Sequence, residues 1–161
     1  MVAELVEASF TDFFYNMDIV KAQIEHLEVL MPLFDSYRQF YRQDSNLEKA
    51  KAFLHERIIN NESVIYIAYL NDKAVGFTQL YPLFSSVSME RMYILNDLFV
   101  DVSCRNNGVG NQLIQAAKDL CVTKKYKGLG IQTEYTNPAQ HLYERLGFLK
   151  DTDLQFFWTN K

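Results

Sequence analysis

The sequence has few of the residues that would mark a secreted, membrane-spanning or metal-binding protein. It contains two cysteines, Cys104 and Cys121, whose positions fit neither a disulfide framework nor the ligand spacing of a zinc site. No run approaches the roughly 18 consecutive apolar residues of a membrane-spanning helix. The N-terminal segment carries Glu4, Glu7 and Asp12 and lacks a basic start, so it does not resemble a signal peptide. These absences predict a cytoplasmic protein with no metal and no membrane partner.

The length and the net charge limit the number of domains and the kinds of partner that the chain can have. The 161 residues suit one domain with its own core, because 48% of them are hydrophobic. We predict a single domain over residues 17–161, preceded by an N-terminal extension over residues 1–16. A net charge of −4 argues against a nucleic-acid partner and permits a cationic substrate.

The hydrophobic pattern predicts an α+β fold, arranged like an α/β sandwich, around a mixed and mostly antiparallel sheet. Runs rich in β-branched and aromatic residues predict about seven strands, at 18–22, 64–70, 74–81, 91–100, 130–135, 148–150 and 154–159. Apolar residues at helical spacing predict about four helices, within 24–41, 45–60, 113–121 and 138–146.

Three local signals add detail to this outline. Pro32 is expected to kink or divide the first helix. Ser45 and Glu48 have the spacing of a capping box, which predicts the start of the second helix. Residues 82–89 begin with proline and contain three serines, and they predict a loop.

The apolar run 91–100 leads into Arg105-x-x-Gly108-x-Gly110, and an amphipathic helix follows directly. Such a junction points several unpaired N–H groups and the positive end of a helix dipole at one spot, where glycine lets an anion approach. A pyrophosphate is the expected occupant. The loop lacks the Gly-Lys-Ser/Thr of a P-loop, and no acidic residue follows at the spacing of a dinucleotide-binding fold.

A second motif follows the loop. Residues 137–148 contain Leu142-Tyr143-x-x-x-Gly147-Phe148, a helix that carries a tyrosine and ends at Gly-Phe. Together with the loop, it resembles the GNAT superfamily of acetyl-CoA-dependent N-acetyltransferases, whose order of elements the chain also matches over about residues 18–159. The segment 33–41 resembles the branch related to yeast histone and polyamine acetyltransferases through Leu33, Phe34, Tyr37, Arg38, Phe40 and Tyr41.

The resemblance implies a site for acetyl-CoA. Its pyrophosphate would bind the main-chain N–H groups of Asn106, Asn107, Gly108, Val109, Gly110 and Asn111. The backbone of Leu98, Phe99 and Val100 would pair with the pantetheine arm like an added strand. Arg105 would shape the loop and add positive charge, and Asn137 would contact the cofactor. The family often has glycine where Asn106 stands, and asparagine tolerates the left-handed backbone that such a position needs.

The chemistry requires two proton transfers. A primary amine is mostly protonated at neutral pH, and freeing its lone pair costs roughly 4.6 kcal/mol, which a base helps to meet. The resemblance implies that Tyr143 protonates the departing thiolate as general acid. Asp97 is the candidate for orienting the amine or a water, and the alternative is that it is a structural strand residue. His141 is expected to be a surface residue, because it lies on a different helix face from Tyr143.

The resemblance places the acceptor on the side formed by the first two helices and the loop after the third strand. Tyr37 and Tyr41 would hold an ammonium by cation–π contact, and Glu134 would flank the cleft from a neighbouring strand. The alternative is that Phe34 and Tyr41 belong to the core and that the neighbouring arginines are solvated. The acceptor is a small-molecule amine or a protein lysine. Polyamine acetylation is in doubt, because that branch has a carboxylate pair where this chain has Asn96-Asp97.

Two questions stay open from the sequence. A non-catalytic module that binds acyl-CoA, or a purely structural domain, would need the fold but not Tyr143. The apolar face of the last predicted strand, formed by Leu154, Phe156 and Trp158, predicts a homodimer, and the alternative is that this face closes the core of one chain.

Overall fold

The computed structural model of the protein describes residues 16–153 and 155–160. Its centre is a five-stranded sheet in the order β1-β2-β3-β4-β5. The strands are β1 Met17–Lys21, β2 Val64–Leu70, β3 Lys73–Ser85, β4 Glu90–Val100 and β5 Leu129–Ile131. The first four pair antiparallel, and β5 pairs parallel with β4. The predicted mixed, mostly antiparallel α+β fold is confirmed.

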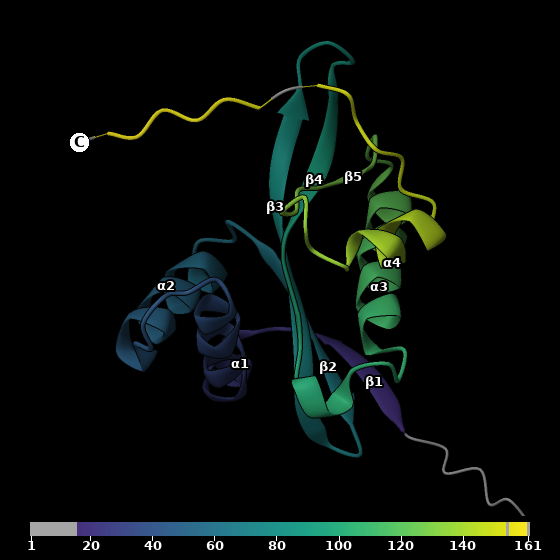
Figure 1. The fold of residues 1–161 in the computed structure, drawn as a ribbon. Helices are drawn as coiled ribbons and strands as arrows, with labels where there is room; N and C mark the ends of the chain where they lie inside the picture. The colour runs from purple at the N-terminus through teal and green to yellow at the C-terminus, as the bar shows by residue number, and fades with distance from the viewer. Residues whose placement is uncertain (1–15, 154, 161) are drawn as a thin grey trace, which may run out of the picture.

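Helices cover both faces of the sheet. They are α1 Leu27–Phe40, α2 Leu47–Ile59, α3 Val109–Lys124 and α4 Gln140–Arg145, with 3-10 turns η1 Ile24–His26 and η2 Val102–Cys104. Figure 1 shows α1 and α2 on one side of the sheet and α3 and α4 on the other. The result is three layers, in which α1, α2 and α3 bury apolar residues against the faces of the sheet.

Successive side chains of β2 contribute to the hydrophobic core on each face of the sheet. Ile67 is fully buried in the cluster beneath α1 and α2, where it joins Leu30, Leu54 and Phe77. Its neighbour Ala68 is equally buried in the cluster beneath α3. Successive side chains of a strand point to opposite faces, so a strand that is buried on both sides lies in the interior of the sheet.

The predicted loop over 82–89 is wrong in its first half. β3 runs on to Ser85, which pairs with Glu90, so only residues 86–89 connect it to β4. Pro82 is tolerated in this strand because the pairing of β3 with β2 ends at Leu80. From that point β3 has no neighbour on its β2 side, and the missing N–H of a proline costs no ladder bond there.

Two helix predictions also change. Pro32 lies inside α1 without dividing it. The cap of α2 is Asn46, whose side chain accepts a hydrogen bond from the Lys49 N–H at 2.9 Å. Ser45 instead donates its hydroxyl to the buried carboxylate of Asp35 in α1, at 2.7 Å. The capping-box prediction therefore marked the right place but the wrong residue.

The described residues form five strands rather than the predicted seven, because residues 148–153 and 155–160 form none. Leu154 lies outside the described residues, as do residues 1–15 of the predicted N-terminal extension. Near the C-terminus Phe156, Phe157 and Trp158 are each at least 80% exposed. No helix within the described ranges is long and apolar enough to cross a membrane.

Candidate functional site

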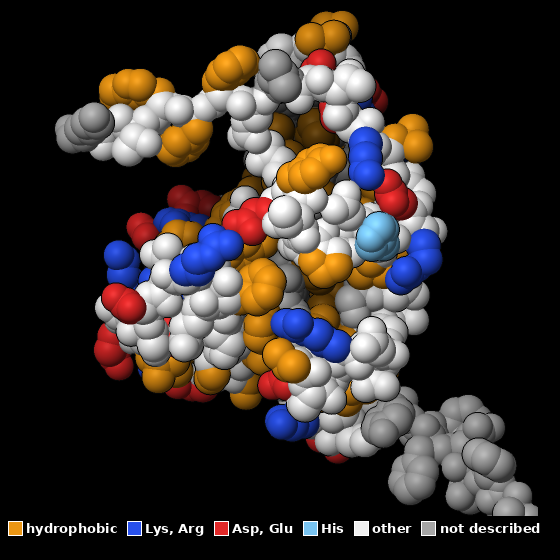
Figure 2. Space-filling model, viewed as in Figure 1, with side chains coloured by type: hydrophobic (Ala, Val, Ile, Leu, Met, Phe, Trp, Pro, Cys, Tyr) orange, Lys and Arg blue, Asp and Glu red, His pale blue; other side chains and the backbone are white. Residues whose placement is uncertain are grey.

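The site opens where two strands part. β5 pairs with β4 only from Tyr93 to Leu95, whereas β4 continues to Val100. Next to the point of separation, Gln79 pairs with Asp97 and Leu80 with Leu95, so Asn96 is the extra residue of a β-bulge. A bulge bends its strand and adds twist. The divergence leaves a cavity of about 770 Å³ between α1 and α4, visible as the hollow at the centre of Figure 2.

The loop that carries the motif Arg105-x-x-Gly108-x-Gly110 forms one end of this cavity. Asn106 and Gly108 adopt left-handed backbone, with φ of 64° and 79°, and Gly108 is the N-cap of α3. The left-handed geometry predicted for Asn106 is confirmed. Within the described part of the chain, the N–H groups of residues 106–111 make no hydrogen bond. These donors and the positive end of α3 form a cradle suited to an anion.

Arg105 ties the loop to the end of β4. Its Nε donates to the Val100 carbonyl oxygen at 3.1 Å, and its guanidinium lies 6.0 Å from the centre of the Phe40 ring. The predicted cofactor residues that line the cavity are Leu98, Phe99, Val100, Arg105, Asn106, Gly108, Val109, Gly110, Asn111 and Asn137. Asn107 does not line it. Its side chain instead donates to the Cys104 carbonyl oxygen and so braces the loop.

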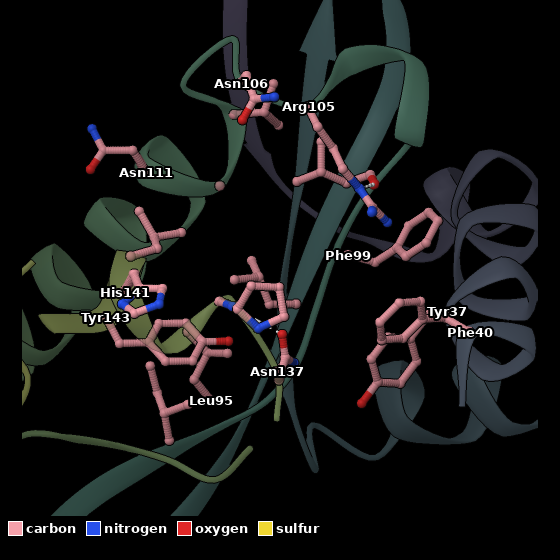
Figure 3. Close-up of a pocket in the computed structure, with 18 of the residues that line it drawn as sticks. Tyr37, Phe40, Leu95, Phe99, Arg105, Asn106, Asn111, Asn137, His141 and Tyr143 are labelled. Atoms are coloured by element: carbon pink, nitrogen blue, oxygen red, sulfur yellow. Dashed lines mark hydrogen bonds between the residues drawn. The ribbon is translucent and has the colours of Figure 1, made fainter. Parts of the chain in front are cut away.

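Tyr143 lies on α4 and faces the cavity. Its ring packs edge-on against Phe148 with 6.1 Å between centroids, and Figure 3 shows its hydroxyl pointing into the cavity, toward the α1 side. That hydroxyl makes no hydrogen bond with any described residue. Burial raises the pKa of Tyr143 to about 12, so the phenol is protonated at neutral pH and is available as a donor.

Contacts with α3 and a tight turn hold α4 in place. Leu142 packs at Gly110, where a Cβ would lie 3.4 Å from its Cδ2. Lys118 of α3 donates to the Leu146 carbonyl oxygen. The turn at Gly147, with φ of 83°, lets the Phe148 N–H return to the Tyr143 carbonyl oxygen.

Asp97 lies behind the cavity rather than in its wall. The residue is only 3% exposed, and its carboxylate accepts hydrogen bonds from Gln79 Nε2 at 2.6 Å and Asn96 Nδ2 at 2.9 Å. Ser63 donates to Gln79 Oε1, which keeps the amide NH₂ turned toward Asp97. Burial raises the pKa of Asp97 above its ordinary value, although these partners and Tyr37 oppose the shift.

The side of the cavity where the acceptor was predicted is formed by α1. Tyr37 and Tyr41 form an edge-on pair with 5.1 Å between centroids, and both line the cavity with Phe40 (Figure 3). The Tyr37 hydroxyl donates to the Asn96 carbonyl oxygen at 3.3 Å. Burial raises the pKa of Tyr41, and the charges of Glu134 and Asp97 add to the effect. The expectation that Tyr37 and Tyr41 flank the acceptor side fits this placement.

Glu134 is not on a strand, because β5 ends at Ile131. It lies in the following segment, outside the cavity wall, and accepts a hydrogen bond from Arg42 Nη1 at 3.5 Å. Arg42 follows α1, so this ion pair joins the two sides of the cavity mouth. Nothing in the local sequence connects Arg42 with Glu134, which are 92 positions apart.

His141 and Arg145 are among the cavity residues that were not predicted as site residues. His141 is exposed, as expected, yet it lines the cavity together with Tyr143. α4 has only six residues and lies along the rim, so neighbouring positions of the helix reach the same opening. Arg145 also lines the cavity. In the described part of the chain, no three His, Cys, Asp or Glu side chains gather closely enough to hold a metal ion.

The model of the acetyltransferase (GNAT) family matches residues 28–148. The chain belongs to this family. An uncharacterized N-acetyltransferase of Bacillus subtilis, YhfO, is 49% identical over 145 residues, covering 89% of this chain and 97% of the relative. A probable acetyltransferase of Haemophilus influenzae is 42% identical over 141 residues, which cover 80% of this chain and 97% of that protein.

Two solved structures of acetyltransferases have the same fold as this chain. The crystal structure of a probable acetyltransferase, 39% identical, superposes with a TM-score of 0.83 over 89% of this chain and 97% of the other. An aminoglycoside N-acetyltransferase in complex with CoA shares the fold at 22% identity, with a TM-score of 0.78 over 91% of this chain and 97% of its own.

Proposed function

We propose that this acetyltransferase moves the acetyl group of acetyl-CoA to a primary amine by direct attack, with both substrates bound at once. The observation that carries the proposal is the row of N–H groups at 106–111 at one end of a cavity into which the Tyr143 hydroxyl points. The loop donors suit the pyrophosphate of coenzyme A. The edge of β4 at residues 98–100, which β5 leaves free, suits the amide groups of the pantetheine arm.

Tyr143 is proposed as the general acid. The amine nitrogen bonds to the acetyl carbon to give a tetrahedral intermediate, and its collapse breaks the C–S bond while the sulfur takes the phenolic proton. The nitrogen loses its extra proton to solvent, and the phenolate takes a proton back, so the products are the amide and the free thiol. A phenol with a pKa of about 12 is a weaker acid than a thiol of about 8.5 in water. The same burial also raises the proton affinity of the departing thiolate, so the mismatch within the cavity is smaller than these two values indicate.

Asp97 is proposed to orient the amine or an attendant water rather than to touch it. Its carboxylate lies behind the cavity wall, and the groups between it and the cavity are Tyr37 and Asn96. The hydroxyl of Tyr37 and the carbonyl oxygen of Asn96 are the polar atoms that an incoming amine would meet. Asp97 acts through their positions and holds negative charge near the developing ammonium.

Release of free thiol from acetyl-CoA tests the function. We expect coenzyme A to raise the melting temperature, since it binds only the folded chain, and thiol release to depend on an added amine. If coenzyme A stabilises the protein but no amine in a broad panel accelerates thiol release, the protein is an acyl-CoA-binding module and not an enzyme.

We also propose that the chain forms a homodimer through its C-terminal region. The support is the exposure of Phe156, Phe157 and Trp158, three large apolar side chains within three positions. Exposed aromatic groups so close together favour a protein interface. Light scattering at micromolar concentration should give twice the 18.8 kDa of one chain. A monomer mass for the full chain would contradict the proposal.

A further inference from the structure

The charge of the cavity wall restricts the acceptor, if the proposed function holds. Among the described residues that line the cavity there are Arg105, Arg145 and His141, but no aspartate or glutamate. The nearest buried carboxylate, Asp97, lies behind the wall and is already hydrogen-bonded to Gln79 and Asn96. An acceptor with several ammonium groups would lose hydration here without gaining an anionic partner, which is unfavourable.

The mouth of the cavity carries one further arginine, Arg42, which is paired with Glu134. Arg42 lies beside Tyr41, which lines the cavity, and its side chain is 78% exposed. Its partner Glu134 is 46% exposed, and the two meet at 3.5 Å across the opening. Exposed ion pairs of this kind add little to stability, so Arg42 can exchange Glu134 for another anion at small cost. Glu134 then remains hydrated.

The backbone of Arg42 determines where its side chain leaves α1. It follows Tyr41, the C-cap of α1, with a left-handed φ of 64°. Glycine or asparagine usually occupies that conformation after a helix, because a larger side chain makes it less favourable. The Arg42 side chain therefore leaves the chain directly after the C-terminal end of α1, where the helix dipole favours a cation.

We propose that Arg42 binds an anionic group of the acceptor, and that the preferred acceptor is a small primary amine that carries a carboxylate and no second cation. The amine end reaches the acetyl group beyond Tyr37 and Tyr41, and the carboxylate stays at the mouth, where the guanidinium can bind it through two hydrogen bonds. This deepens the proposed function and depends on it. The carboxylate takes no part in bond making, so the reaction remains acetyl transfer from sulfur to nitrogen.

A matched series of four-carbon amines tests the proposal. Butylamine, 4-aminobutanoate and 1,4-diaminobutane present the same reacting group, with a neutral, an anionic and a cationic far end. We expect kcat/KM to be highest for 4-aminobutanoate and lowest for the diamine. β-Alanine with propylamine and 6-aminohexanoate with hexylamine repeat the anionic-to-neutral comparison at shorter and longer spacing, so that one unsuitable length does not decide the result.

Variants of Arg42 test whether this residue causes the preference for the amino acid over the neutral amine. The readout is the ratio of kcat/KM for the best amino acid to that for its neutral partner. Arg42→Gln should lower this ratio about tenfold, the size of one charge-assisted interaction, and Arg42→Glu should lower it further and favour the diamine. Lys51→Gln removes the same charge from α2, where Lys51 pairs with Glu28 away from the cavity, and should leave the ratio unchanged.

The outcomes separate the two proposals. A diamine preferred by the wild-type protein, or a ratio that Arg42→Gln does not change, would overturn the role of Arg42 while amine acetylation stands. If no amine in the series releases thiol, the proposed function fails instead. Calorimetric titration of the coenzyme A complex with 4-aminobutanoate and the diamine then decides the acceptor proposal: tighter binding of the amino acid that depends on Arg42 supports it, and no such difference overturns it.

Discussion

The two walls of the cavity are built in different ways. The wall proposed for coenzyme A consists of consecutive residues, 106–111, whose backbone N–H groups converge at the start of α3. The opposite wall consists of side chains from α1 and from the segment after β5, which lie far apart along the chain. One wall depends on backbone conformation and tolerates many side chains, whereas the other depends on which side chains the fold brings together.

The walls also differ in charge from the chain as a whole. The protein carries a net charge of −4, yet the cavity wall that the structure describes has cationic side chains and no carboxylate. Net charge describes solubility and long-range attraction, while recognition follows the few groups that line the site. We therefore propose that an acceptor with a second cationic group, which the composition permits, is not the one that the cavity favours.

The largest expected effect is at Tyr143, which lies between the two walls. Tyr143→Phe removes one hydroxyl and little volume, so the fold and the affinity for coenzyme A should be retained. If Tyr143 protonates the thiolate, kcat should fall by about 10²- to 10⁴-fold, with a much smaller change in the KM for acetyl-CoA. Steady-state kinetics with the best amine measures both values.

Tyr135→Phe is the matched control for this change. Tyr135 is 95% exposed and does not line the cavity, so the same loss of a hydroxyl should leave kcat unchanged. A loss nearer tenfold at Tyr143 would mean that water replaces the phenol or that the thiolate leaves unaided. Unchanged turnover would remove Tyr143 from the mechanism.

Gly108→Glu tests whether the loop wall acts through its backbone. The variant places a side chain and a negative charge at the cradle, and a non-glycine residue is strained at a φ of 79°. We expect the dissociation constant for coenzyme A, measured by calorimetry, to rise at least tenfold.

Two controls separate the causes. Gly108→Ala imposes the strain without the charge, and its Cβ would meet no atom within 4 Å, so its effect should be clearly smaller. Gly147→Glu adds the same charge at a φ of 83° beyond α4, outside the cavity wall. If Gly108→Glu binds coenzyme A as tightly as the wild-type protein, the pyrophosphate site is assigned wrongly.

The sequence predicts the fold and the loop wall well, because both depend on local signals. Strand 64–70 matches β2 at both ends, since a run of β-branched and aromatic residues is bounded there by turn residues. The left-handed positions of the loop fall at Asn106 and Gly108, residue types that favour them. The loop predicted from Pro82 fails because the proline is tolerated only where β2 has ended, and the sequence of β3 does not show where that is.

The acceptor wall is predicted less completely, because its geometry depends on distant contacts. The local sequence around Asp97 does not show that Gln79 and Tyr37, from another strand and from α1, enclose its carboxylate. It also does not show the pairing of Arg42 with Glu134. Residue types marked Tyr37, Tyr41, Asp97 and Glu134 as candidates, but only the fold separates those that line the cavity from those behind it or at its rim.

The smallest expected effect concerns the burial of Asp97 and the pH dependence of stability. Because burial raises the pKa of Asp97 above 3.8, the folded protein holds this proton more tightly than the unfolded chain does. Stability from this group is therefore fully present below pH 3.8 and is lost as the pH rises through the folded-state pKa. Asp97→Asn removes this pH-dependent loss of stability. The NH₂ of the new asparagine would face Asn96 Nδ2, so the variant also loses one hydrogen bond at every pH. The melting temperature of the variant minus that of the wild-type protein should become more positive between pH 4 and pH 7, by roughly 2–4 °C for each kcal/mol involved.

Asp44→Asn at an exposed position is the control and should show no such trend. A difference that stays constant, or that moves in favour of the wild-type protein as the pH rises, would show that the carboxylate is not disfavoured behind the acceptor wall.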